Sequence, residues 1–142
     1  MKTLNQYLAL YAESHQNKVN KNIHYICVPL IMWTVLILLD LVSLPIGTLA
    51  YVLVILSFVF YNVIKTPVLD SLLMMILSLV MIALSRIFND SRMHVAITIF
   101  VLAWIGQFVG HKIEGKKPSF FQDLLFLLIG PMWILQSFKR KD

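Results

Sequence analysis

The sequence predicts an all-α, polytopic membrane protein that forms one integral membrane domain over residues 1–142. We expect about four transmembrane helices, an N-terminal amphipathic helix and a C-terminal re-entrant or interfacial helical segment. Hydrophobic residues make up 59% of the chain and charged residues only 13%, whereas soluble domains are about one quarter charged. The mean hydropathy is +0.81, and apolar segments that approach or reach bilayer length recur along the chain.

The N-terminal segment, residues 2–16, has the pattern of a short amphipathic helix. Leu4, Tyr7, Leu8 and Tyr11 follow the i, i+3, i+4, i+7 spacing that places side chains on one helix face. Such a helix can lie in the membrane interface or pack on the rest of the protein. The pattern leaves both alternatives open.

Four apolar segments follow, at residues 22–39, 48–64, 68–84 and 95–110. Pro29 can kink the first of them. Three helix-breaking connections separate these segments. They are residues 40–47, which contain a proline and a glycine, Lys65-Thr66-Pro67, and the polar stretch 86–92. The sequence therefore predicts four crossings separated by short connections.

A fifth apolar segment, residues 120–138, differs from the other four. Asp123 and Gly130-Pro131 interrupt it, and a basic tail follows. With four crossings, both termini and the lysines around residue 115 lie in the cytoplasm, as the positive-inside bias requires. We therefore expect the fifth segment to be re-entrant or interfacial, broken at Gly130-Pro131 and, at membrane depth, covered there by protein.

Three histidines lie in the two polar parts of the chain next to these segments. His15 and His24 are nine residues apart, on opposite faces of a straight helix. Their rings converge only if the chain turns between them, and Asn17, Asn20 and Asn22 favour such a turn. An even number of crossings brings His111 to the same membrane face.

This pattern predicts a metal site, because neutral imidazole is the commonest protein metal ligand. Three histidines suffice to hold a catalytic metal with open positions. Glu114 lies one helical turn after His111, where it can orient that ring or ligate the metal itself. The alternative is that each histidine only bonds backbone or lipid head groups.

Other polar residues have simpler interpretations. His94 begins the fourth segment, roughly 25 Å from His111 at its end, so we interpret it as structural. Glu13 and Asp123 are the other acids near the site. Cys27 begins an apolar helix and is expected to be a buried structural thiol. The net charge of +5 suits anionic head groups and predicts no nucleic-acid partner.

Two motifs carry a family resemblance. Residues 15–24 contain H-Q-x-K-x-N-x-x-x-H, and a second motif lies around the third histidine. Its matching residues are Trp104, Gln107, Phe108, Gly110, His111, Glu114 and Pro118. With Gly130-Pro131, they resemble a small membrane-protein family that includes the fungal 2-hydroxy fatty acid dioxygenase of phytosphingosine breakdown. Gln136 and Ser137 depart from that pattern, which has an acid at about this position.

The resemblance implies alpha-oxidation that depends on Fe(2+) and shortens a 2-hydroxy fatty acid by one carbon, with O2 as co-substrate. It implies iron on His15, His24 and His111, with Glu114 in support. Lys18, Lys21 or Lys112 would attract the substrate carboxylate. Membrane lipids are the expected surroundings, in a bacterial inner membrane or the endoplasmic reticulum, with the site facing the cytoplasm.

Two other function classes stay open at this point. One is a zinc-dependent hydrolase acting on lipids, and the other is a non-enzymatic membrane scaffold or lipid-binding protein. A transporter fits less well, because the apolar segments carry almost no ionisable residues. Substrate chain length, a fourth metal ligand and the oligomeric state have no determinant in the sequence.

Overall fold

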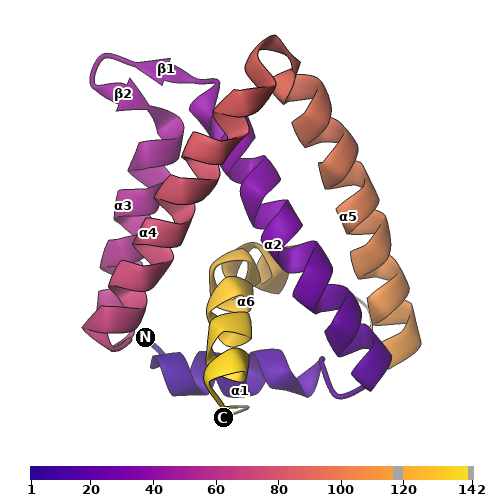
Figure 1. Cartoon of the computed structure of the whole chain (residues 1–142). Helices are drawn as coiled ribbons and strands as arrows, with labels where there is room; N and C mark the ends of the chain where they lie inside the picture. The colour runs from indigo at the N-terminus through magenta and orange to yellow at the C-terminus, as the bar shows by residue number, and fades with distance from the viewer. Residues whose placement is uncertain (117–119, 141–142) are drawn as a thin grey trace. The chain divides into compact units, whose positions relative to one another are not determined.

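The computed structural model describes the backbone of residues 1–116 and 120–140, and the side chains of residues 1–116 and 125–140. Its elements, labelled in Figure 1, are almost all helical, which confirms the all-α prediction. The helices are α1 (Leu4–Glu13), α2 (Lys18–Asp40), α3 (Leu49–Val63), α4 (Val68–Ser85), α5 (Arg92–Glu114) and α6 (Phe120–Arg140). A 3-10 helix, η1 (Arg86–Ser91), and a hairpin of β1 (Ser43–Leu44) and β2 (Gly47–Thr48) complete the list.

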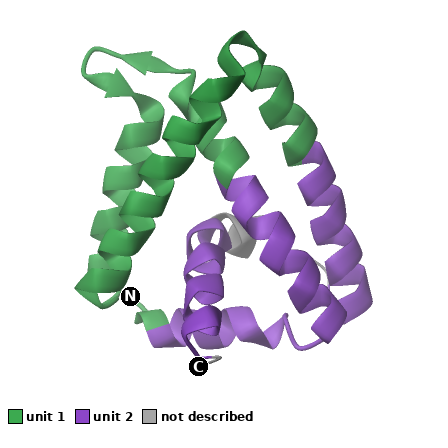
Figure 2. Ribbon diagram, viewed as in Figure 1, with its two compact units in different colours: residues 1–4, 33–100 green, residues 5–32, 101–142 purple. Residues whose placement is uncertain are grey.

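The chain divides into two compact units, coloured separately in Figure 2. The first comprises Met1–Leu4 and Trp33–Phe100, and the second comprises Asn5–Met32 and Val101–Asp142. Each unit therefore contains segments that are far apart in the sequence.

In the first unit, α3 and α4 lie side by side (Figure 1). Ser71, Ser78 and Ser85 recur every seven residues on the buried face of α4. Each hydroxyl donates a hydrogen bond to a carbonyl of the preceding turn, so burial leaves these donors satisfied. Small side chains at this spacing let a neighbouring backbone approach closely.

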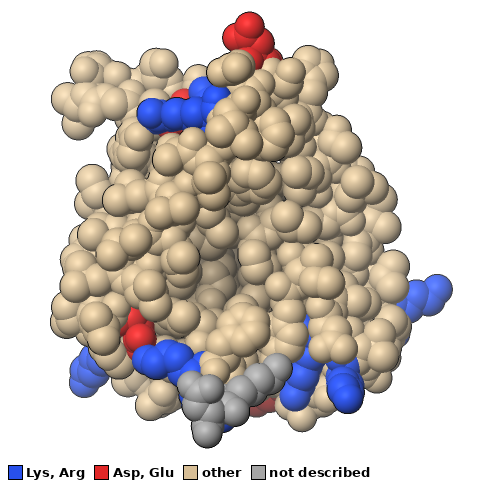
Figure 3. All heavy atoms as spheres, viewed as in Figure 1, with Lys and Arg blue, Asp and Glu red and all other residues tan. Residues whose placement is uncertain are grey.

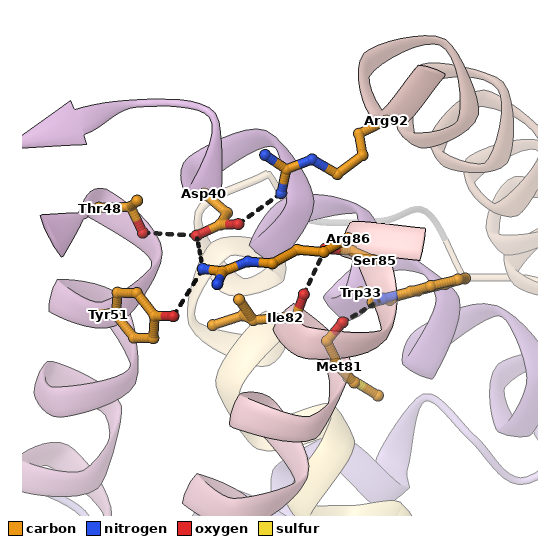
Figure 4. Close-up of polar contacts among 9 residues, drawn as sticks. All are labelled: Trp33, Asp40, Thr48, Tyr51, Met81, Ile82, Ser85, Arg86 and Arg92. Atoms are coloured by element: carbon orange, nitrogen blue, oxygen red, sulfur yellow. Dashed lines mark hydrogen bonds and ion pairs between the residues drawn. The ribbon is translucent and has the colours of Figure 1, made fainter. Parts of the chain in front are cut away.

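The same unit contains an ion-pair network around the buried Asp40, the last residue of α2 (Figure 4). Arg92 Nη1 lies 2.6 Å from Asp40 Oδ2, and Arg86 Nη2 lies 3.4 Å from Oδ1. Thr48 Oγ1 donates to Oδ1 at 2.8 Å, and Arg86 also donates to the hydroxyl of Tyr51. These bonds connect the end of α2 to the hairpin, α3, η1 and the start of α5.

The expectation of four transmembrane helices is not supported. Within the described residues, two helical stretches are long and apolar enough to cross a membrane: Lys18–Asp40, and Val68–Glu114, which contains α4, η1 and α5. Helix α3 has 15 residues, about 22 Å of helix, against a hydrocarbon core of about 30 Å. On the face drawn in Figure 3, the surface over the middle of α3 and α4 carries no charged side chain.

The expected break at Gly130-Pro131 is wrong, because α6 runs through both residues as one helix. The glycine serves close packing instead. A Cβ at Gly130 would lie 3.0 Å from the hydroxyl of Tyr11 and 3.1 Å from Val28 Cγ1. Pro29 also lies inside a helix, because α2 continues through it. Helix α1 is shorter than the helix predicted over residues 2–16.

Candidate functional site

The second unit brings the three histidines of the two polar segments together. The ring centroids of His15 and His24 lie 4.3 Å apart. His111 lies 5.3 Å from His24 and 6.1 Å from His15 by the same measure. All three side chains are buried, with exposed fractions of 2%, 1% and 9% for His15, His24 and His111. The rings thus form one cluster from three parts of the chain.

A turn over residues 14–17 makes the convergence of His15 and His24 possible. The asparagines between the two histidines favoured such a turn. Helix α1 ends at Glu13 and α2 begins at Lys18, so His15 lies between the helices and His24 within α2. Asn17 starts α2, because its Oδ1 accepts hydrogen bonds from the backbone N–H groups of Val19 and Asn20. The turn is shorter than predicted, and Asn20 and Asn22 lie inside α2.

The histidines of this turn and helix share one bonding pattern. Nδ1 of His15 lies within hydrogen-bond distance of the carbonyl of Tyr11, and Nδ1 of His24 lies 2.9 Å from the carbonyl of Asn20. A carbonyl only accepts, so each Nδ1 carries the proton and each Nε2 keeps its lone pair. Both Nε2 atoms are buried without a hydrogen-bond partner among the described residues. This is the pattern of a histidine whose ring is oriented for ligation.

Burial also keeps His15 uncharged at neutral pH. Removal from water lowers the pKa of His15 to about 4, and the nearby His111 lowers it further, while the bond to the Tyr11 carbonyl acts in the opposite direction. The imidazole is therefore neutral at pH 7 and available as a donor.

Glu114, the last residue of α5, connects that helix to the turn before α2. Its carboxylate accepts hydrogen bonds from the backbone N–H groups of Gln16 at 2.8 Å and Asn17 at 2.9 Å. It also accepts one from the side-chain amide of Asn20 at 3.0 Å. A carboxylate at a helix N-terminus is electrostatically favourable. The sequence predicted that Glu114 orients His111 or ligates the metal, and both stay predictions. The three bonds in the structure position the turn that carries His15.

Two glycines let α5 approach α2 at the histidine cluster. A Cβ at Gly110 would lie 3.2 Å from Cε1 of His24 and would overlap Oδ1 of Asn20. A Cβ at Gly106 would lie 2.6 Å from the Sγ of Cys27, closer than real Cβ atoms come to any neighbour. The spacing of four residues puts both glycines on one face of α5.

Aromatic rings cover one side of the cluster. Tyr11 stacks on His15 at a centroid distance of 4.1 Å and an interplanar angle of 5°. Trp133 of α6 lies 5.4 Å from His15 and 5.1 Å from Tyr11 by centroids. Nothing in the local sequence around Trp133 links it to the histidines.

The cluster borders a small cavity of about 30 Å³, which is large enough to hold a water-sized group. Its lining residues are Tyr11, Ser14, His15, His24, Val28, Ile31, Trp104, Gln107, His111, Phe126 and Leu127. Such a cavity has room for a metal-sized or hydroxyl-sized group beside the histidines.

Comparison with known proteins identifies the family of this chain. The sequence model of the family described as 2-hydroxy-palmitic acid dioxygenase Mpo1-like matches residues 1–141. The chain belongs to the Mpo1-like family. It is 31% identical over 143 residues to the 2-hydroxy-palmitic acid dioxygenase MPO1 of Saccharomyces cerevisiae, covering 97% of this chain and 80% of the yeast protein. No solved structure matches the chain.

The other predicted residues of this Mpo1-like chain whose side chains the structure describes are not among those that line the cavity. Lys18 begins α2 and is exposed, as is Lys112 near the end of α5. His94 is exposed near the start of α5, in the first unit. Glu13 is exposed and its carbonyl accepts a bond from Lys116, and the side chain of Asp123 lies outside the described residues.

The imidazoles of this cluster suit a transition metal, iron and zinc among them. Two of them keep a buried Nε2 atom without a hydrogen-bond partner among the described residues, and the third ring lies beside them. The arrangement is not a completed coordination sphere, since no three His, Cys, Asp or Glu side chains of the described part of the chain stand in metal-binding positions. The role of His15, His24 and His111 as ligands stays a prediction.

Proposed function

We propose that this protein is an integral membrane dioxygenase that depends on Fe(II) and shortens 2-hydroxy fatty acids by one carbon. The observation that carries the proposal is the buried cluster of His15, His24 and His111 in a chain of the Mpo1-like family. A relative of 31% identity is named a 2-hydroxy-palmitic acid dioxygenase. Carboxylates that bear a 2-hydroxyl group are therefore the proposed substrate class.

The overall reaction balances with O2 as the only oxidant. A 2-hydroxy acid R–CH(OH)–COOH and one O2 give R–COOH, CO2 and water. The bond between the carboxyl carbon and the hydroxyl-bearing carbon breaks, and the latter becomes the new carboxyl carbon. Both carbons are oxidised while O2 is reduced.

The chain's own residues have three tasks in this proposal. His15, His24 and His111 hold the iron, which supplies the electron-transfer chemistry that lets O2 react with an organic acid. Tyr11 and Trp133 exclude water from the cluster. Glu114 keeps the turn next to His15 in place through its bonds to Gln16 and Asn17.

A membrane location suits the exposed surface of the helices. Large apolar side chains are exposed on α3, α4 and α5, among them Ile55 at 60%, Leu69 at 76% and Leu102 at 63%. In each candidate membrane-spanning stretch only 33% of the most apolar window is buried, so contact with lipid would cover the remainder. In the second unit, Lys18 and Lys112 lie at the helix ends next to the histidine cluster, which on the positive-inside bias would face the cytoplasm.

The test combines metal analysis with oxygen uptake on protein purified in detergent. We expect iron in the purified protein, oxygen uptake with 2-hydroxy-palmitic acid, and a product acid one carbon shorter. Zinc in place of iron, with release of a fatty acid from a lipid ester, would support the hydrolase alternative. If replacing each of the three histidines by alanine leaves metal content and every activity unchanged, the chain acts as a scaffold or lipid-binding protein.

A further inference from the structure

Gln107 is a buried polar residue of the cavity to which the proposed function gives no task. It lies on α5 one helical turn before His111, lines the same cavity and is 8% exposed. Its Oε1 is buried and has no hydrogen-bond partner within the described residues. A buried carbonyl oxygen without a donor is unfavourable, and in native proteins it commonly has a functional reason.

The cavity wall combines apolar side chains with polar ones, including the indole N–H of Trp104, but no described residue donates a hydrogen bond to Oε1 of Gln107. Val28, Ile31 and Leu127 of the cavity wall have apolar side chains. The Nε2 atoms of His15 and His24 are themselves acceptors in the tautomer that their Nδ1 bonds select. The cavity therefore presents an unpaired amide oxygen, to which an incoming O–H or N–H group can donate.

We infer that Gln107 binds the 2-hydroxyl group of the substrate and makes the enzyme specific for 2-hydroxy acids, an inference that rests on the proposed function. At neutral pH the carboxylate of the acid has no proton to donate, and the acyl chain has no polar hydrogen at all. The 2-hydroxyl is the donor of such a molecule. It lies one bond from the carbon that is oxidised, so a group that binds it also places that carbon beside the histidines.

The same geometry excludes fatty acids without the hydroxyl. Their entry would leave Oε1 of Gln107 buried and unpaired, and a site built to pair a hydroxyl discriminates strongly against the analogue that lacks it. The cavity volume of about 30 Å³ admits a hydroxyl-sized group next to Gln107.

The experiment measures binding and turnover separately on the iron-loaded protein in detergent. Quenching of tryptophan fluorescence gives the Kd, because Trp104 lines the cavity. The ligands are 2-hydroxy-palmitic acid and palmitic acid. Gln107→Met removes the amide at nearly constant length, and Gln136→Met on α6 is the matched control, a part-buried glutamine that is not among the residues lining this cavity.

In the wild type and in Gln136→Met we expect the 2-hydroxy acid to bind about 10-fold or more tightly than palmitic acid. In Gln107→Met we expect this ratio to fall to about one, mainly through weaker binding of the 2-hydroxy acid, with iron content and helicity retained. If Gln107→Met loses helicity, Gln107→Asn, whose shorter amide is withdrawn from the cavity, is expected to lower the ratio at least 3-fold. If a folded Gln107→Met or Gln107→Asn variant keeps the wild-type ratio of affinities for the two acids, the inference is overturned.

Turnover separates this result from the proposed function. Oxygen uptake by the wild type together with an unchanged ratio in Gln107→Met leaves the dioxygenase proposal standing and removes Gln107 from the site. The opposite result is also informative. If the affinity ratio falls to about one in Gln107→Met but the wild type takes up no oxygen, the dioxygenase proposal is overturned and Gln107 remains the residue that binds the hydroxyl group.

Discussion

The carboxylate of Glu114 and the side-chain amide of Asn20 are joined by a hydrogen bond of 3.0 Å between the end of α5 and the first turn of α2. The same amide donates to the carbonyl of Ser14 at 3.1 Å. Asn20 thus links α5 to the turn in which His15 lies, and its own backbone carbonyl accepts the bond from His24. The positions of two histidines depend on this one pair of residues.

Glu114→Gln should weaken iron binding about 10–100-fold, the usual effect of altering a residue that supports metal ligands. The amide has one oxygen where the carboxylate has two, so it cannot accept bonds from Gln16, Asn17 and Asn20 in the same way. Iron affinity measured by competition with a chelator tests this. His111→Ala is the comparison and should lose more; equal loss in both variants would make Glu114 a direct ligand.

His15→Ala, His24→Ala and His111→Ala should each lower bound iron and oxygen uptake with a 2-hydroxy fatty acid, while helicity is retained. His94→Ala is the control, because His94 is exposed near the other end of α5. Elemental analysis and an oxygen electrode measure the two quantities. Normal iron in one of the first three variants would remove that residue from the site, and normal iron in all three would end the proposal of a metalloenzyme.

Gly106→Ala should destabilise the second unit by about 1–3 kcal/mol, the typical cost of overpacking. The added Cβ would lie 2.6 Å from Sγ of Cys27, which forces α5 away from α2 or changes the cysteine rotamer. Thermal unfolding in detergent, followed by circular dichroism, measures the change.

The double variant Gly106→Ala/Cys27→Ala provides the control for that close approach. Removing Sγ makes room for the new methyl group, so the double variant should be more stable than the sum of the two single changes predicts. Strict additivity of the two effects would show that the contact between Gly106 and Cys27 does not limit the helix spacing.

Arg92→Met should destabilise the first unit more than Arg86→Met. The Arg92 side chain is 18% exposed and pairs with Asp40 at 2.6 Å, whereas that of Arg86 is 53% exposed and pairs at 3.4 Å. Loss of Arg92 leaves the Asp40 carboxylate, 1% exposed, with its weaker partner, at a cost of about 3 kcal/mol. Loss of the exposed pair should cost about 1 kcal/mol or less.

Melting temperatures of the two arginine variants, measured under the same detergent conditions, test this order. Lys65→Met in the same unit is the control for loss of one positive charge, because Lys65 is exposed between α3 and α4. Equal destabilisation by Arg86→Met and Arg92→Met would contradict the assignment of Arg92 as the main partner of Asp40.

The helices were predictable because their signals are local. Proline, glycine and charged residues bound each apolar run, so the start of α4 at Val68 and the end of α2 near residue 40 follow from the sequence. The turn between His15 and His24 was likewise indicated by Asn17, which caps α2 with its own side chain. The number of membrane crossings was not predictable in this way, because hydropathy marks α3 as apolar without showing that it has only 15 helical residues.

Contacts between distant residues required the tertiary structure. Glu114 bonds to residues almost a hundred positions earlier, and Arg92 pairs with Asp40 across 52 positions. The local sequence around Glu114 or Arg92 does not indicate which residue it contacts. The same holds for Gln107 and Trp133 at the histidine cluster.

The sequence by itself determined that the chain is helical, that its apolar segments end where they do, and that three histidines flank them. Only the tertiary structure decided which side chains share a cavity and which polar atoms in it are paired. The physical reason is that helix formation and capping depend on neighbours within about four positions. Burial and hydrogen bonding between helices instead depend on how closely two backbones approach, and here glycines at positions 106, 110 and 130 permit that approach.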